Sequence, residues 1–121
     1  MERTAKLTVV ARAVHEAIRA YQAAAGEEEA PPWEASRWMQ ESTLEAVEFA
    51  LDNPTPGAQH AAWCESKRRD GWRYGPAKDE SQKTHPSLVP FENLSESERR
   101  KDALLIAVVQ AVAPVLDLRR A

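Results

Sequence analysis

The chain has 121 residues, of which 43% are hydrophobic and 29% charged, so it suits one domain with a buried core and is not typical of a disordered protein. The formal net charge of −3 provides no overall positive field, so we do not expect DNA binding despite the basic cluster at residues 67–69. A single cysteine, Cys64, excludes an intramolecular disulfide, and the sequence has neither a signal-peptide pattern nor a run of about 20 apolar residues. We therefore expect a cytoplasmic protein that is not inserted in a membrane.

The first predicted helix covers residues 7–21, where apolar side chains recur at helical spacing. Thr4 is suited to cap its start and Gly26 to end it. The next segment, GEEEAPP at 26–32, predicts an acidic linker because its two prolines cannot continue a helix.

Two further helices are expected in the middle of the chain. The first covers residues 37–51 and ends at the turn signal DNPTPG. Its expected buried residues are Met39, Ala46, Val47 and Ala50. The second covers 58 to about 69, with Thr55 and Pro56 suited to the cap and the first helical position, and Gly71 ends it.

A fourth helix is expected after Ser95, which forms a capping-box pattern with Glu98. Its apolar positions are Leu104, Leu105, Val108, Val109, Val112, Val115 and Leu116. This apolar arc is too broad for a surface helix, so we expect the helix to be central. Pro114 should kink the helix or end it early.

The two halves of the chain show a faint internal repeat. VHEAIRAY at 14–21 parallels QHAAWCES at 59–66, and PPWE at 31–34 parallels VPFE at 89–92. The second half is longer because it contains the irregular segment 71–85. Chance similarity between two amphipathic helix pairs is the alternative explanation.

The sequence carries no recognisable catalytic or metal-binding constellation. His60 and Cys64 share a helix face and could supply two zinc ligands, with His85 as a third, but no matching pair exists elsewhere, so we expect no metal. Cys64 lacks the surroundings of a nucleophile, and the neighbouring carboxylates Asp79 and Glu80 point apart. No glycine-rich phosphate-binding motif is present, so we expect neither an enzyme nor a bound cofactor.

Aromatic and basic residues gather at 63–78. The aromatic residues are Trp63, Trp72 and Tyr74, and the basic residues are Lys67, Arg68, Arg69, Arg73 and Lys78. Flat rings can stack a base for about 1–3 kcal/mol, and nearby cations can hold phosphates. The alternative is that the tryptophans merely cover one end of a small core.

The most specific pattern is a run of aromatic, glycine, proline and histidine residues. It reads His-x-x-Trp, Gly-Trp-x-Tyr-Gly, an Asp, a Lys, His-Pro-x-Leu-Val-Pro-Phe and a Leu. The residues at these positions are His60, Trp63, Gly71, Trp72, Tyr74, Gly75, Asp79, Lys83, His85, Pro86, Leu88, Val89, Pro90, Phe91 and Leu94. With this pattern, the segment from 58 to about 113 resembles the repeat of ryanodine receptors, the RyR domain.

The resemblance implies a mainly α fold, a four-helix RyR-repeat domain with short β-segments over residues 1–121. Residues 54–118 would form a complete repeat and residues 1–53 a degenerate first copy, related to it by a pseudo-twofold axis. The first copy has Ile18 in place of the tryptophan and lacks the segment from Gly-Trp-x-Tyr-Gly to His-Pro. The pattern therefore does not support a symmetric clamp of two tryptophans.

RyR repeats also occur in small bacterial and phage proteins and in defence-associated proteins, and the family is associated with binding adenine nucleotides. The resemblance therefore implies a non-catalytic module that binds a nucleotide or nucleotide-derived signal, as a sensor or a sponge, with Trp63 stacking the base. The candidate ligand-binding residues are His60, Trp63, Lys67, Trp72, Arg73, Tyr74, Lys83 and His85. The alternative is a structural or protein-interaction module that uses its aromatic face to dock a partner or to form a homodimer.

The remaining motif residues are expected to shape the loop. They are Gly71, Gly75, Asp79, Pro86, Leu88, Pro90 and Phe91. The glycines allow sharp turns, with Trp72 and Tyr74 on one side of a short extended piece. The prolines hold their preceding residues extended, Leu88 and Phe91 anchor the segment, Asp79 ties the loop to backbone N–H groups or an arginine, and Lys83 reaches toward the ligand.

Overall fold

Within residues 1–118, which the computed structural model describes, the chain forms four α-helices and two very short strands. The helices are α1 (Arg3–Ala24), α2 (Arg37–Ala50), α3 (Pro56–Arg69) and α4 (Glu96–Val112). Parallel strands β1 (Arg73–Tyr74) and β2 (Thr84–His85) lie between α3 and α4, and the 3-10 helices η1 (Trp33–Ala35) and η2 (Phe91–Asn93) precede α2 and α4. The expected mainly α fold with short β-segments is confirmed. None of the described helices has the length and apolar character that a membrane span requires.

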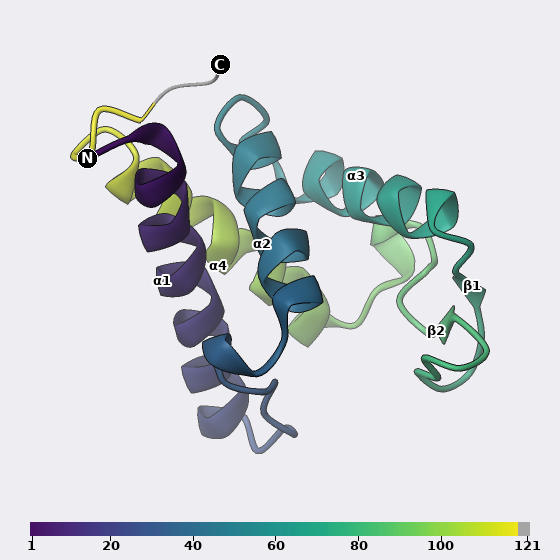
Figure 1. Cartoon of the computed structure of the whole chain (residues 1–121). Coiled ribbons are helices and arrows are strands. Elements are labelled where there is room, and N and C mark those ends of the chain that lie inside the picture. The colour runs from purple at the N-terminus through teal and green to yellow at the C-terminus, as the bar shows by residue number, and fades with distance from the viewer. Residues whose placement is uncertain (119–121) are drawn as a thin grey trace.

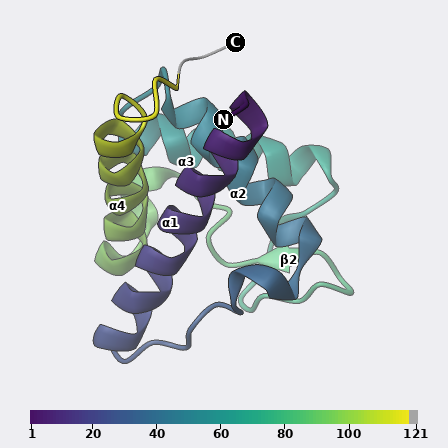
Figure 2. The ribbon, with the colours of Figure 1, turned by 60° about the vertical axis from the view of Figure 1, so that its left-hand side comes forward.

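Three of the helices form a bundle, and the fourth projects from it. α1 packs against both α2 and α4, which run antiparallel to it (Figures 1 and 2). α3 packs against α2 and α4 and carries the loop with β1 and β2 on the side away from α1 (Figure 1). α4 therefore contacts all three other helices, as predicted for a central helix. α2 also contacts all three others.

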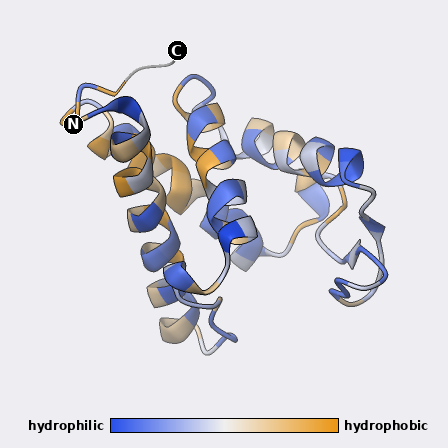
Figure 3. Ribbon diagram, viewed as in Figure 1, coloured by the Kyte–Doolittle hydropathy of each residue, from blue (hydrophilic) through white to orange (hydrophobic). Residues whose placement is uncertain are grey.

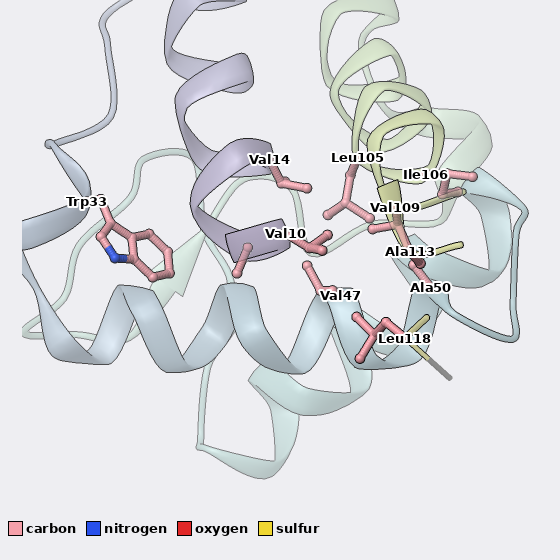
Figure 4. Packing of buried hydrophobic residues seen from close by; sticks show 11 residues of the cluster. Val10, Val14, Trp33, Val47, Ala50, Leu105, Ile106, Val109, Ala113 and Leu118 are labelled. Carbon is pink, nitrogen blue, oxygen red and sulfur yellow. The ribbon is translucent and has the colours of Figure 1, made fainter. Parts of the chain in front are cut away.

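The bundle is held together by a core of small branched side chains. Val10 and Val14 of α1, Val47 of α2 and Val109 of α4 are fully buried where the three helices meet (Figure 4). Burying each such side chain stabilises the fold by roughly 1.5–3 kcal/mol. Trp33, from η1, closes one end of this core (Figure 4).

The two ends of α1 differ in how well the sequence predicted them. Gly26 ends the helix as expected: its φ is +73°, and the next N–H, that of Glu27, donates to the Gln22 carbonyl at 2.9 Å. The predicted cap at Thr4 is wrong. The helix begins at Arg3, with Glu2 in the cap position and no side-chain cap, so Thr4 lies inside the first turn.

The other three helices begin at side-chain caps. Ser36, Thr55 and Ser95 each accept a hydrogen bond from the N–H three residues further on, at 3.2, 3.4 and 3.2 Å. The predicted caps at Thr55 and Ser95 are confirmed, and Pro56 occupies the first turn of α3. These short-range contacts set where each helix starts.

The C-terminal end of α4 is shorter than its apolar pattern predicts. The helix ends at Val112, and Pro114 lies in the turn that follows, which confirms that this proline ends the helix early. Val115 was predicted on the apolar arc, but it is 82% exposed because it follows the end of the helix.

The two halves of the chain make the same long-range contact. His15 on α1 donates from Nε2 to the Pro31 carbonyl at 2.6 Å, and His60 on α3 donates from Nε2 to the Val89 carbonyl at 2.8 Å. Each imidazole also lies near the aromatic ring that opens η1 or η2, with ring centroids 5.8 and 6.3 Å apart. Each contact thus holds a Pro-aromatic-Glu segment in front of the next helix, α2 or α4.

Candidate ligand-binding site

The loop between α3 and α4 needs glycine at two positions, for different reasons. Gly71 adopts a φ of +89°, which glycine adopts without strain, and its N–H donates to the Arg68 carbonyl at 3.0 Å at the end of α3. Gly75 is needed because β1 lies close to β2: a Cβ atom there would sit 2.6 Å from the Cβ of Thr84. The first glycine therefore sets a turn, and the second permits a close approach.

Two polar side chains fasten this loop, which is largely hydrophilic (Figure 3). Asp79 accepts hydrogen bonds from the N–H groups of Ser81 and Gln82 at 2.9 and 3.2 Å, as expected, and its pKa is lowered by the Ser81 side chain and these N–H groups. Lys83 donates from Nζ to the Asp70 carbonyl at 2.6 Å. The lysine thereby ties the loop to the C-terminal end of α3.

Three tryptophans and two lysines line a pocket of about 160 Å³ where α2, α3 and the loop meet, which we call the tryptophan pocket. Its lining residues are Trp38, Met39, Ser42 and Thr43 of α2, Trp63 and Lys67 of α3, and Trp72, Lys78 and His85 of the loop. The lining contains two lysines and no carboxylate. The pocket therefore combines aromatic walls with positive charge.

Lys67 is a buried cation inside this aromatic cage. The residue is 6% exposed, and its Nζ lies 3.8 Å from the ring centroid of Trp38, 5.5 Å from that of Trp72 and 6.0 Å from that of Trp63. Among the described residues, no carboxylate oxygen lies within 4 Å of this nitrogen. Burial lowers the pKa of Lys67 and Lys78 lowers it further, whereas the carboxylates of Asp70 and Glu45 act in the opposite direction. The ammonium group is thus in contact with ring faces and has carboxylates only at longer range, with no ion pair.

The rings of the pocket are not equally open to a ligand. His60 stacks on Trp63 with centroids 5.6 Å apart and an interplanar angle of 20°, so a ligand could stack only on the opposite face. His85 makes an edge contact with the same indole at 5.0 Å. Trp38 lies nearly parallel to Trp72 at 6.3 Å and remains 45% exposed, so it offers the most accessible ring.

His85 is held as a neutral donor. Its Nδ1 accepts a hydrogen bond from the Ser87 N–H at 3.0 Å, which leaves the ring proton on Nε2. Burial and the nearby Lys78 lower the pKa of His85, so the neutral form prevails at pH 7. The ring therefore lines the pocket without adding charge to it.

The structure brings together some of the predicted ligand-binding residues. Trp63, Lys67, Trp72 and His85 line the tryptophan pocket. His60 lies behind Trp63, where its Nε2 also lies 3.3 Å from the Sγ of Cys64. His60 therefore holds the loop and supports the indole ring of Trp63.

The other predicted residues lie outside the pocket. Arg73 and Tyr74 form β1 and are exposed, the tyrosine by 58%. Trp72 and Tyr74 were expected to share one wall, but Trp72 precedes the two-residue strand and is buried between α2 and α3. Lys83 lines a separate open hollow, to which Trp38 and Trp72 also contribute.

Of the two hydrophobic anchors predicted for the loop, Leu88 is buried with Cys64 and Trp72 in a small second core, as expected. Phe91 opens η2 and is only half-buried against His60. The prolines of this segment, Pro86 and Pro90, are exposed.

Trp38 is the residue that the sequence reasoning missed. It lies on α2, far from the loop in sequence. The sequence signal that could have identified it was a large aromatic residue on the exposed side of an amphipathic helix. Only the packing of α2 against α3 and the loop places its ring over Lys67. Within residues 1–118, no group of three or more His, Cys, Asp or Glu side chains is arranged to hold a metal ion.

A family model described as RyR domain matches residues 34–111. This range begins before residue 58, where the resemblance in the sequence starts, and it covers α2, α3, the loop and most of α4. All three tryptophans of the pocket lie inside it. No solved structure matches the chain significantly.

Proposed function

The chain belongs to the RyR domain family, and from that premise we propose that it is a non-catalytic module that binds an adenine nucleotide or a nucleotide-derived signal in the tryptophan pocket. The observation that carries this proposal is Lys67, a buried ammonium group with ring faces around it and no ion pair to a carboxylate of the described residues within 4 Å. A cation in this position is costly without an anionic partner. A phosphate group of the ligand supplies that partner, and the tryptophans supply surfaces for the base.

The charge of the pocket supports an anionic ligand. Lys78 lines the same pocket, and its charge lowers the pKa of both Lys67 and His85. An anion that binds between Lys67 and Lys78 raises the pKa of Lys67 and of His85 again, because it stabilises the protonated forms of these two groups. Binding should therefore weaken as the pH rises from about 7.5 to about 9.5, a range in which the phosphate stays fully ionised.

The biological role is proposed by analogy with the small bacterial and phage proteins that carry this repeat. We propose a cytoplasmic sensor that responds to the nucleotide signal, or a protein that sequesters it, in bacterial or phage defence. In either role the protein needs a pocket that holds the ligand without transforming it.

Calorimetry with mono-, di- and cyclic adenine nucleotides tests this proposal. Wild-type protein should bind at least one of them, and Trp63→Ala should weaken binding by about tenfold, because one stacked ring contributes roughly 1–3 kcal/mol. Arg73→Ala, outside the pocket on β1, is the control and should bind as the wild type does. Absence of any binding to wild type at millimolar nucleotide would disprove the nucleotide proposal.

The exposed rings of Trp38 and Tyr74 favour a second candidate, a docking surface for a partner or for a second copy of the chain. Sedimentation of wild type and of the Trp38→Ala/Tyr74→Ala double variant separates the two. A homodimer that the double variant dissociates supports docking. A monomer at every concentration, together with nucleotide binding, supports the ligand pocket.

A further inference from the structure

The tryptophan pocket is too small to hold a whole nucleotide. Its volume is about 160 Å³, whereas pockets for small-molecule ligands usually measure at least roughly 300 Å³. Lys67 is 6% exposed, so a phosphate group that contacts its ammonium group lies inside this pocket. The rest of a bound nucleotide must therefore extend into a space that adjoins the pocket.

Two other spaces adjoin the tryptophan pocket and share aromatic walls with it. One lies between α2 and α3, has a volume of about 180 Å³ and shares Ser42 and Trp63 with the tryptophan pocket; we call it the α2–α3 pocket. The other is the open hollow that Lys83 lines, which measures about 530 Å³ and shares Trp38 and Trp72; we call it the outer hollow. A ligand that extends along either set of shared rings enters one of these two spaces.

Both adjoining spaces carry more negative than positive charge. The ionisable residues that line the α2–α3 pocket are Glu45, Glu65 and Arg69, and those that line the outer hollow are Asp70, Glu80 and Lys83. Arg69 is already paired with Glu45, at 3.5 Å between Nη2 and a carboxylate oxygen. The tryptophan pocket, by contrast, is lined by two lysines and no carboxylate. An excess of positive charge is thus found in the smallest of the three spaces.

The carboxylates on both sides act on the tryptophan pocket itself. Burial is the largest influence on the pKa of Lys67 and lowers it, whereas Asp70 and Glu45 raise it. Asp70 belongs to the outer hollow and Glu45 to the α2–α3 pocket, so negative charge acts on Lys67 from both directions. A chain of phosphate groups that extends either way from Lys67 therefore moves toward like charge, which weakens binding.

Given nucleotide binding as proposed above, we infer that the site selects nucleotides with a single phosphate group, such as a nucleoside 5′-monophosphate, over di- and triphosphates. The one phosphate lies beside Lys67 and Lys78, and the uncharged ribose and base occupy an adjoining space. Hydroxyl groups of the ribose are hydrogen-bond donors, which carboxylates accept. A second or third phosphate would instead lie among those carboxylates.

Calorimetry with adenosine 5′-mono-, di- and triphosphate tests this selection. The titrations contain no Mg²⁺, which would neutralise the added phosphates, and are run at about 50 mM salt. Wild type should bind the monophosphate most tightly. Each added phosphate should weaken binding by about two- to fivefold, the range typical of interactions between exposed charges. The differences should narrow at about 500 mM salt, because the carboxylates are exposed and salt screens them.

Two variants assign the effect to the carboxylates. Glu45→Gln/Glu65→Gln removes the negative charges of the α2–α3 pocket, and Glu80→Gln removes one of those of the outer hollow. The variant on the side that the phosphate chain enters should lose most of the preference for the monophosphate. Glu28→Gln, which removes the same charge from the exposed linker before η1, is the matched control and should keep the preference of wild type.

The outcomes separate this inference from the proposed function. Wild type that binds the di- or triphosphate at least as tightly as the monophosphate overturns the selection and leaves nucleotide binding in place. A preference for the monophosphate that both carboxylate variants keep overturns the role of the adjoining spaces. Absence of binding by all three nucleotides and by the cyclic nucleotides of the earlier panel overturns both proposals. The comparison of ligands on wild type needs no variant, and thermal melting checks that the variants are folded.

Discussion

Replacing Lys67 by Met separates the contribution of this residue to binding from its contribution to stability. Methionine keeps an unbranched side chain of similar length, so the space between Trp38 and Trp72 stays filled, and only the ammonium group is lost. The variant forfeits the attraction between the cation and the ring of Trp38, which is worth about 0.5–2 kcal/mol. It also removes the cost of burying the charge, which has the opposite sign. The free energy of unfolding should therefore stay within about 1 kcal/mol of wild type, or about 4 °C in melting temperature.

Nucleotide affinity should respond much more strongly. A hydrogen bond between a buried ammonium group and a phosphate contributes about 1.5–3 kcal/mol, so Lys67→Met should bind adenosine 5′-monophosphate roughly 10- to 150-fold more weakly. Calorimetry and thermal melting measure the two quantities on the same samples. Arg73→Met, which removes one exposed positive charge from β1, is the matched control and should change neither. Unchanged affinity in Lys67→Met would refute the reasoning, as would a destabilisation of more than 3 kcal/mol, which would make Lys67 a structural residue.

The same lysine predicts a pH dependence. Because its folded-state pKa is lowered, the stability of wild type rises with pH between that pKa and the unfolded value, so wild type should gain stability relative to Lys67→Met as the pH is raised toward 10. Burial raises the pKa of Asp102 to about 7, so the protonated form is favoured in the folded protein and its contribution to stability is lost as the pH rises through 7. Asp102→Asn should therefore have a higher melting temperature than wild type at pH 8. An equal or lower melting temperature of the variant at that pH would contradict this. Gly75→Ala should destabilise the fold by about 1–3 kcal/mol in urea titrations, because the added Cβ would sit 2.6 Å from the Cβ of Thr84. Gly57→Ala, on α3 with nothing within 4 Å of the new atom, is its control and should not destabilise; equal effects at both glycines would count against the close approach of β1 and β2.

Short-range signals in the sequence determined the positions of the helices. Thr55, Ser95 and Gly26 act within a few residues of their own position, through a capping hydrogen bond or a left-handed φ, so their neighbours in the chain suffice to identify them. The same holds for Asp79, whose hydrogen-bond partners lie two and three residues further on. Thr4 shows the limit of such signals, because α1 begins before it and uses no side-chain cap.

The pattern from His60 to Leu94 determined the family, and the family model extends the matched range back to residue 34. It also identified Trp63, Trp72 and His85 as residues of one region, and the cluster of aromatic and basic residues added Lys67. The structure places all four around one pocket. We expected Trp72 and Tyr74 to lie on one side of an extended strand. This prediction is wrong for Tyr74, because β1 is only two residues long and Trp72 lies before it.

Only the tertiary structure decided which residues complete the site. Trp38 reaches Lys67 because α2 packs across α3. The burial of Lys67 likewise depends on rings from α2, α3 and the loop together. Helix caps and turns need only neighbouring residues, whereas a pocket needs the crossing of helices that are distant in sequence, and the local pattern does not encode that crossing.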